Sequence, residues 1–243
     1  MKRTAVAAAV LLSLTACGIE LEATPQHSNQ TFPFTGGALT IKVPLGGLRV
    51  TQGTGPQVVV DRWLRGKAAK DGNSAWTLRD GTLALTARCT LNFGDCGARY
   101  TVAVPSGVPV LVEGGDDGVI VSGLAQNVTL VTTGGSIKVD GLSGILRLRS
   151  DDGSITAVRT RSADVRARTN SGAIRLGFDT APTKVDAASD DGRVVATVPA
   201  GEYSVRVESK DGRARSTVKD AGPGATKKII ARSFTGNVTV TAN

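Results

Sequence analysis

Paired aspartates in front of a glycine are the residues of this sequence whose types and spacing best suit chemistry. The Asp-Asp-Gly pattern occurs three times, and an aliphatic residue stands two places after each glycine, in GDDGVI, SDDGSI and SDDGRV at residues 115–120, 150–155 and 189–194. Adjacent carboxylates can ligate calcium, or can act as acid and base on a saccharide. Asp-Gly can also form a tight turn, because Asp bonds its own backbone and glycine accepts positive φ.

The turn is the interpretation that explains every copy. The related segments TTGGSI, TNSGAI and SKDGRA keep turn residues but lose the acid pair. If each copy forms one coil and coils lie about 4.8 Å apart, acid pairs in alternate coils are roughly 10 Å apart. That distance is too long for two pairs to share one calcium ion, whose ligands lie about 2.4 Å away. We therefore predict that these acids form corners and hold no metal, with a calcium site as the alternative.

A catalytic interpretation has less support from the sequence. Polysaccharide-cleaving sites need two carboxylates across a cleft and aromatic platforms for the sugar rings. Within the repeats the aromatic residues are only Phe178, Tyr203 and Phe234, and the single histidine, His27, is far away in the sequence. A Ser–His or Cys–His pair is therefore excluded from the repeats. We predict no catalytic residues and no cofactor.

The glycine of this motif marks a repeat that positions the acids. It recurs at steps of 17 to 24 residues, as Gly118, Gly135, Gly153, Gly172, Gly192, Gly212 and Gly236. The residues two and four places later are mostly aliphatic or small, and the residue between them is mostly polar. Each copy therefore predicts a strand that buries its +2 and +4 residues. A second strand in each unit has the inward pairs Val128/Leu130, Leu146/Leu148, Val165/Ala167, Val185/Ala187 and Val205/Val207.

Two short strands and two corners use all the residues of one repeat, which leaves no room for a helix. We therefore predict an all-β, single-domain β-solenoid, similar to a parallel β-helix, over residues 36–243. Residues 113–243 are the regular repeats, and residues 36–112 are a less regular N-terminal part. The alternative is a β-sandwich of hairpins, which would need turns every 8–12 residues and would not preserve the register.

Four arginines form the one surface feature that suggests a ligand. If each 18- or 19-residue step equals one coil, Arg147 neighbours Arg166, and Arg149 neighbours Arg168, at about 4.8 Å. Asp186 and Arg206 are expected on the next two coils. This arginine square is either a solvated face whose long stems cover aliphatic neighbours, or a docking patch for an anionic polymer or an acidic partner, because the guanidinium fork suits phosphate and carboxylate.

The N-terminus predicts export and a lipid anchor. Lys2 and Arg3 precede an apolar run that is too short to span a bilayer. The run ends in Leu14-Thr15-Ala16-Cys17, which resembles the bacterial lipobox. This resemblance implies that a signal peptide, residues 1–16, is removed and that lipid on Cys17 anchors an extracytoplasmic protein to the cell membrane. The alternatives are an ordinary signal peptide with a chance cysteine and a buried apolar helix. The polar residues 17–35 predict a flexible tether.

Charge and cysteine content limit the partners. The formal net charge is +8, or +6 without Lys2 and Arg3, which does not by itself indicate nucleic acid. For an exported protein, anionic envelope polymers or lipid head groups are the more natural partners. Cys89 and Cys96 form an even pair, which predicts a disulfide. A zinc site with two cysteines would need further ligands.

The segment YTVAVPSGVPVLVEGGDDGVIVSGL at residues 100–124, followed by units of the form small-x-[Asp/Ser]-Gly-x-[Ile/Val], resembles the bacterial putative-adhesin family of β-strand-repeat proteins, a domain of unknown function. The resemblance covers roughly residues 36–243. It implies a β-solenoid of the kind often found on exported or lipid-anchored proteins, and it brings no catalytic residues. We therefore expect a lipid-anchored, non-enzymatic binding or structural module of the cell envelope. The alternatives are a carbohydrate-active β-helix enzyme and an accessory protein of a membrane signalling system.

Overall fold

The computed structural model describes residues 24–89 and 95–243, so the lipobox and Cys17 lie outside the described residues. Within those two ranges, no helix is both long and apolar enough to cross a membrane. Strands form almost all of the regular structure there, together with one short 3-10 helix, η1 (Lys67–Ala69). The predicted all-β class is confirmed.

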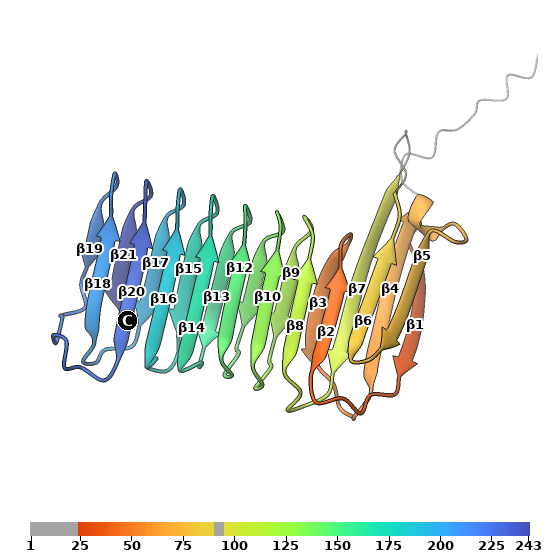
Figure 1. Ribbon diagram of the computed structural model, residues 1–243, viewed down its shortest axis with the longest axis horizontal. Helices are drawn as coiled ribbons and strands as arrows, with labels where there is room; N and C mark the ends of the chain where they lie inside the picture. The colour runs from red at the N-terminus through yellow and green to blue at the C-terminus, as the bar shows by residue number, and fades with distance from the viewer. Residues whose placement is uncertain (1–23, 90–94) are drawn as a thin grey trace, which may run out of the picture.

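The strands form two sheets that face each other (Figure 1). In spatial order, the 11-stranded sheet contains β1 (Gln26–Phe32), β4 (Val58–Gly66), β7 (Cys96–Val104), β3 (Gly47–Gln52), β9 (Val119–Ser122), β11 (Ile137–Asp140), β13 (Ile155–Thr160), β15 (Ile174–Phe178), β17 (Val194–Val198), β21 (Val238–Ala242) and β19 (Ala214–Ser216). The 10-stranded sheet contains β18 (Ser204–Ser209), β20 (Lys228–Ser233), β16 (Lys184–Ser189), β14 (Asp164–Thr169), β12 (Leu146–Ser150), β10 (Val128–Thr132), β8 (Val110–Gly114), β2 (Leu39–Val43), β6 (Thr82–Ala87) and β5 (Ser74–Arg79).

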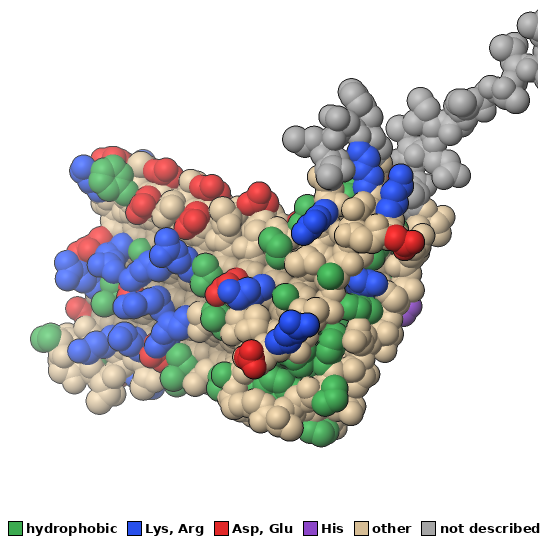
Figure 2. Space-filling view, turned by 45° about the vertical axis from the view of Figure 1, so that its right-hand side comes forward, with side chains coloured by type: hydrophobic (Ala, Val, Ile, Leu, Met, Phe, Trp, Pro, Cys, Tyr) green, Lys and Arg blue, Asp and Glu red, His purple; other side chains and the backbone are tan. Residues whose placement is uncertain are grey.

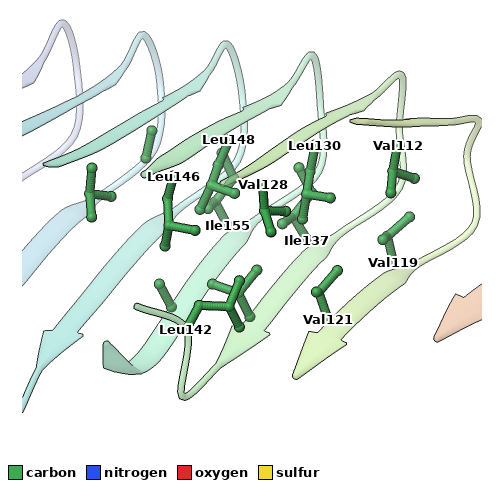
Figure 3. Packing of buried hydrophobic residues seen from close by; sticks show 14 of the residues in the cluster. Val112, Val119, Val121, Val128, Leu130, Ile137, Leu142, Leu146, Leu148 and Ile155 are labelled. Atoms are coloured by element: carbon green, nitrogen blue, oxygen red, sulfur yellow. The ribbon is translucent and has the colours of Figure 1, made fainter. Parts of the chain in front are cut away.

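The middle of the molecule is the predicted solenoid. From β8–β9 to β16–β17, each coil adds one strand to each sheet, and successive coils pair in parallel. The register places Val128, Leu146 and Val165 in line on one sheet, and all three side chains are buried. Aliphatic side chains from both sheets meet in a continuous core (Figure 3). Buried and exposed residues therefore alternate along each strand, and one face of each strand packs into the core.

The first repeat differs from the predicted register by one residue. Ile137 pairs with Val119, and the buried residues of β9 are Val119 and Val121 instead of Ile120 and Ser122. Pairing in this register buries two apolar side chains, whereas the predicted one would bury the hydroxyl of Ser122. The glycine spacing therefore misaligned this copy.

Six of the seven repeat glycines, all except Gly118, are required by a close approach between coils and not by positive φ. Gly153 and its equivalents are absent from the described glycines that have positive φ. A Cβ on Gly153 would lie 2.3 Å from the carbonyl oxygen of Gly135, and one on Gly192 would lie 1.9 Å from that of Gly172. Real Cβ atoms do not come this close to backbone, so the coils can stack at this corner only when a glycine is present.

A buried hydroxyl stands three residues before most of these glycines and links neighbouring coils. Ser189 Oγ accepts a hydrogen bond from Gly192 N and donates one to Gly172 O in the preceding coil, both at 2.8 Å. Ser150, Thr169, Ser209 and Ser233 make the same pair of bonds. The hydroxyls therefore satisfy backbone groups that would otherwise be buried without partners.

The coil order departs from the chain order at both ends. The coil β2–β3 lies next to β8–β9, with β6 and β7 outside it, and the last coil, β20–β21, lies between β16–β17 and β18–β19. The prediction from the repeat pattern, which stacks Val205 and Arg206 directly after Val185 and Asp186, is wrong. It fails because every coil presents the same alternating pattern, so the pattern does not specify which coil is the neighbour.

The predicted tether extends too far into the domain. Residues 26–32 form strand β1, which pairs antiparallel with β4 at the edge of the 11-stranded sheet. The polar residues that suggested a tether have partners on β4: Arg62 Nε donates to Ser28 Oγ at 2.8 Å, and Asn29 Nδ2 donates to Asp61 at 3.0 Å. An edge strand tolerates such polarity because one of its sides faces solvent.

Candidate functional site

The arginine square predicted from the sequence is present on the outer side of the 10-stranded sheet. Strands β12 and β14 pair in parallel, with Arg147 opposite Arg166 and Arg149 opposite Arg168. The buried residues between them, Leu148 and Ala167, face the core. The four cations therefore share one face, as the step of one coil requires.

Acids offset part of this charge. Arg147 donates two hydrogen bonds to the carboxylate of Asp164, from Nη1 at 3.0 Å and from Nη2 at 2.8 Å. Arg149 contacts Asp151 of the adjacent corner at 3.3 Å. Because Arg147 is held in a bidentate pair, its fork is already occupied. Arg147 therefore contributes more to the fold than the sequence alone suggested.

Asp186 is the acid at the centre of the cluster. Its side chain is only 9% exposed, and it contacts Arg166 at 3.5 Å, Arg168 at 2.5 Å and Arg232 at 3.4 Å. Burial raises the pKa of Asp186, but the hydrogen bond from Arg168 and the three guanidinium charges lower it more, so the pKa lies below the ordinary value. One carboxylate therefore faces three cations, and the cluster keeps a positive charge.

Arg168 has two terminal nitrogens, and only one of them is paired with an acid. Its Nη2 donates to Asp186 at 2.5 Å. Its other terminal nitrogen, Nη1, is buried and meets no acceptor among the described residues. A buried charged donor without an acceptor is costly, so Asp186 satisfies only part of the hydrogen-bonding capacity of Arg168.

The cationic surface extends well beyond the square. Arg232 on β20, Lys184 on β16, Lys228 on β20 and Arg206 on β18 point to the same side, and Lys184 pairs directly with Lys228. We name these eight residues the cationic face: Arg147, Arg149, Arg166, Arg168, Lys184, Arg206, Lys228 and Arg232. Half as many acids lie beside these cations: Asp151, Asp164, Asp186 and Glu208. Figure 2 shows Lys and Arg side chains gathered over the C-terminal coils, with Asp side chains along the corner edge above them.

The corner acids make local contacts and do not converge. Asp116 Oδ1 accepts a bond from Gly134 N at 3.1 Å, and Asp152 Oδ1 accepts one from Ser171 Oγ at 3.1 Å, each in the next coil. Thr235 Oγ1 lies 3.4 Å from Asp191 in the same way. Over residues 24–89 and 95–243, His, Cys, Asp and Glu form no group of three or more that could hold a metal ion. The geometry therefore fits the corner interpretation of the Asp-Asp-Gly motif.

The cysteine pair is bonded as predicted. Cys89 and Cys96 form a disulfide with their Cα atoms 5.8 Å apart, inside the usual range. His27 lies on β1, stacked on Trp63 with ring centroids 4.8 Å apart, and it bonds Asp61 at 2.9 Å. Neither pair lies near the cationic face, which is formed by other strands.

Comparison with known proteins identifies the repeat. The family described as Toastrack DUF4097 matches residues 69–241, which is most of the chain. The chain belongs to the Toastrack family. This family is a domain of unknown function, so membership confirms the expected relationship and the solenoid-like fold without assigning an activity.

Two solved structures that are similar to this Toastrack chain come from a putative adhesin and a putative cell adhesion protein. A putative adhesin from Parabacteroides distasonis ATCC 8503 is 13% identical over 90% of this chain and 97% of that chain, with a TM-score of 0.52. A putative cell adhesion protein from Clostridium sporogenes ATCC 15579 is 10% identical over 90% of this chain and all of that one, with a TM-score of 0.42. Among curated proteins, none matches the chain. At 13% identity, the likeness to the Parabacteroides structure shows the fold alone.

Sequence reasoning missed two features of this Toastrack chain. Arg232 joins the cluster around Asp186 only because β20 is inserted beside β16, and no pattern in the sequence signals that insertion. The coil-linking hydroxyls had a visible signal: Ser or Thr stands three places before the glycine in six of the seven repeats.

Proposed function

We propose that this protein is a non-enzymatic, adhesin-like binding module of the bacterial envelope. In this proposal, lipid on Cys17 holds it at the cell membrane, and the cationic face binds a linear anionic polymer with phosphate or carboxylate groups. The lipobox-like segment supports the anchor, and the adhesin names of proteins with this fold support the class of function.

The observation that carries the proposal is the charge on one sheet face. Eight cations over five neighbouring strands have half as many acids beside them, and Lys184 and Lys228 have no acidic partner among the described residues. The strands are spaced about 4.8 Å apart, so the cations form rows across them along the solenoid axis. A flexible chain of anions can follow such rows, and the acidic corners along one edge would repel it from that edge.

Titration with a purified polymer tests this proposal. We expect the protein, as a chain carrying Cys17→Ser, to bind poly(glycerol phosphate) teichoic acid at low salt and to bind it more weakly at physiological salt, because screening acts over about 8 Å there. Isothermal titration calorimetry measures both affinities. Absence of binding at low salt contradicts the proposal. Binding to vesicles with anionic head groups, but not to the polymer, would identify a membrane surface as the ligand instead.

Replacement of the lipobox cysteine tests the anchor. We expect Cys17→Ser to release the protein from the membrane fraction or to leave it unprocessed, because no thioether lipid can then form. Fractionation and the intact mass of the mature protein measure the two results. Unchanged membrane fractionation and an unchanged mass after processing would show that Cys17 carries no lipid.

A further inference from the structure

The C-terminal coil occupies a slot between two coils that precede it in the chain. Strand β20 pairs with β16 on one side and with β18 on the other, and β21 likewise lies between β17 and β19. The three coils share one register, which aligns Val185, Ile229 and Val205. To admit β20–β21, the outermost coil β18–β19 must stand one coil away from β16–β17.

The outermost coil fits β16–β17 as well as it fits the inserted coil. Gly212 follows Gly192 by the same 20-residue step that separates Gly192 from Gly172. Residues 199–203 connect β17 to β18 and equal in length the connection 179–183 between β15 and β16. With β20–β21 withdrawn, the chain can therefore close the slot in chain order, with the same alternation of buried residues. The slot has two arrangements, open and closed.

Specific contacts favour the open arrangement filled by β20–β21. Across the slot, Arg232 reaches Asp186 at 3.4 Å and Thr235 Oγ1 lies 3.4 Å from Asp191. On the other side, the ammonium group of Lys210 lies 4.1 Å above the Phe234 ring. In chain order, Asp191 would instead lie next to Asp211, and Asp190 next to Lys210. The inserted coil separates Asp191 from Asp211, which removes that like-charge contact.

The connection that leads into the slot lies at the outer end of the solenoid and is mostly exposed, apart from Val218, which is buried against the core. Residues 217–227 include Gly222, Pro223 and Gly224, and they run from β19 back to the start of β20. Asp220 fastens this connection by accepting bonds from the backbone N–H groups of Val205 and Gly222, each at 3.0 Å. Ala221 N also donates to Tyr203 O at 2.8 Å. The coil that the connection carries can therefore leave the slot only when these bonds are released and Val218 leaves the core.

We propose that the C-terminal coil of one copy enters the slot of a second copy, so that two chains of this protein associate by exchange of residues 228–242. Each contact of the inserted coil is kept in the exchanged pair, and only the connection 217–227 changes its path. Repeat proteins are prone to such exchange, because any compatible coil can compete for an open end. The second copy is the partner that matches on both sides of the slot, with Arg232 for Asp186 and Phe234 for Lys210.

Two threonines across the slot allow a direct test. Thr197 on β17 and Thr241 on β21 are paired, and their hydroxyl oxygens lie 3.2 Å apart on the outer side of the sheet. Neighbouring strands place Cα atoms at a separation that a disulfide can bridge. One chain carrying Thr197→Cys and another carrying Thr241→Cys, each also with Cys17→Ser, are unfolded together, refolded and oxidised. Thr197 and Thr241 face each other across the slot, so a disulfide between these two chains, in excess of random cross-linking, reports the C-terminal coil of one chain in the slot of the other.

We expect a covalent heterodimer on a non-reducing gel, in an amount that rises with the protein concentration during refolding. A segment on a short connection has an effective concentration of roughly 1 mM, so about a tenth of the chains should exchange at about 0.1 mM, and about tenfold less after tenfold dilution. Thr156→Cys, on the same face but away from the slot, replaces Thr197→Cys in the control and should give no heterodimer. Absence of heterodimer at every concentration, or equal amounts with Thr156→Cys, overturns the proposal. The gel does not depend on polymer binding, so the two proposals fail independently.

Discussion

Gly192→Ala is expected to lower the free energy of unfolding by about 2–4 kcal/mol, within the range for overpacking at a buried site. A Cβ at this position would lie 1.9 Å from the carbonyl oxygen of Gly172. Relief requires the two coils to move apart, and Ser189 would then lose its hydrogen bond to Gly172 O in the neighbouring coil. Urea unfolding followed by circular dichroism measures the change.

Two control variants distinguish this close approach from the loss of a glycine as such and from a change in the corner acids. A Cβ on Gly177 would meet Ala157 O at 3.8 Å, which is ordinary contact, so Gly177→Ala should be neutral or slightly stabilising. Asp190→Asn with Asp191→Ser copies the Asn170-Ser171 corner of the preceding coil and should change stability by less than about 0.5 kcal/mol. A Gly192→Ala variant as stable as the wild type would contradict the stacking. Calcium-dependent melting that the Asp changes abolish would restore the calcium interpretation.

Asp186→Asn is expected to destabilise the protein by about 2–3 kcal/mol and to strengthen polymer binding. The carboxylate is buried among Arg166, Arg168 and Arg232, and its removal leaves three neighbouring cations without their shared partner. The same change adds one positive charge to the cationic face. Solvent screens the exposed guanidinium groups of these arginines, which reduces the loss in free energy of unfolding. Urea unfolding and polymer titration measure the two effects, which have opposite directions.

The pH dependence gives this prediction a second check. The pKa of Asp186 lies below the ordinary value of 3.8 in the folded protein, so its carboxylate stabilises the fold above pH 4. That stabilisation is lost as the pH falls through the folded pKa. The difference in free energy of unfolding between the wild type and Asp186→Asn should therefore be constant from about pH 5 to 8 and should shrink below about pH 4. As a matched control, Asp164→Asn, which loses one half-exposed pair with Arg147, should cost about 1 kcal/mol or less. Equal stability of Asp186→Asn and the wild type at neutral pH would contradict the role given to Asp186.

The parts of the fold that the sequence predicts are those with strict periodicity. Side chains alternate along a strand, so the sequence predicts that Arg147 points outward. Each coil has a nearly constant number of residues, so the sequence also predicts that Arg166 is its neighbour on the next coil. The order of the coils at the ends does not follow, because the coils of Val185, Val205 and Ile229 present the same pattern to any neighbour. The shift at Val119 was missed for a related reason: the glycine marks a corner, and the corner of the first repeat differs by one residue.

The energetic roles of single residues were harder to predict than their positions. The glycines suggested positive φ, whereas the structure shows backbone atoms of the next coil where a Cβ would stand. The acid that holds Arg147 lies at the first position of β14, before the aligned part of the repeat. Such contacts depend on the distance between neighbouring coils and on the length and direction of each side chain. The repeat pattern of the sequence predicts neither of these.

The most direct measurement of the central claim compares charge reversal on the two outer faces of the solenoid. Lys184→Glu with Lys228→Glu changes the cationic face, and Lys138→Glu with Arg175→Glu makes the same charge change on the outer side of the 11-stranded sheet, at similarly exposed positions. If the cationic face is the binding site, affinity for poly(glycerol phosphate) at low salt should fall at least tenfold for the first pair and much less for the second, with both variants folded. Equal losses for the two pairs, or no loss for the first, would show that overall charge alone attracts the polymer and would contradict a binding site on this face.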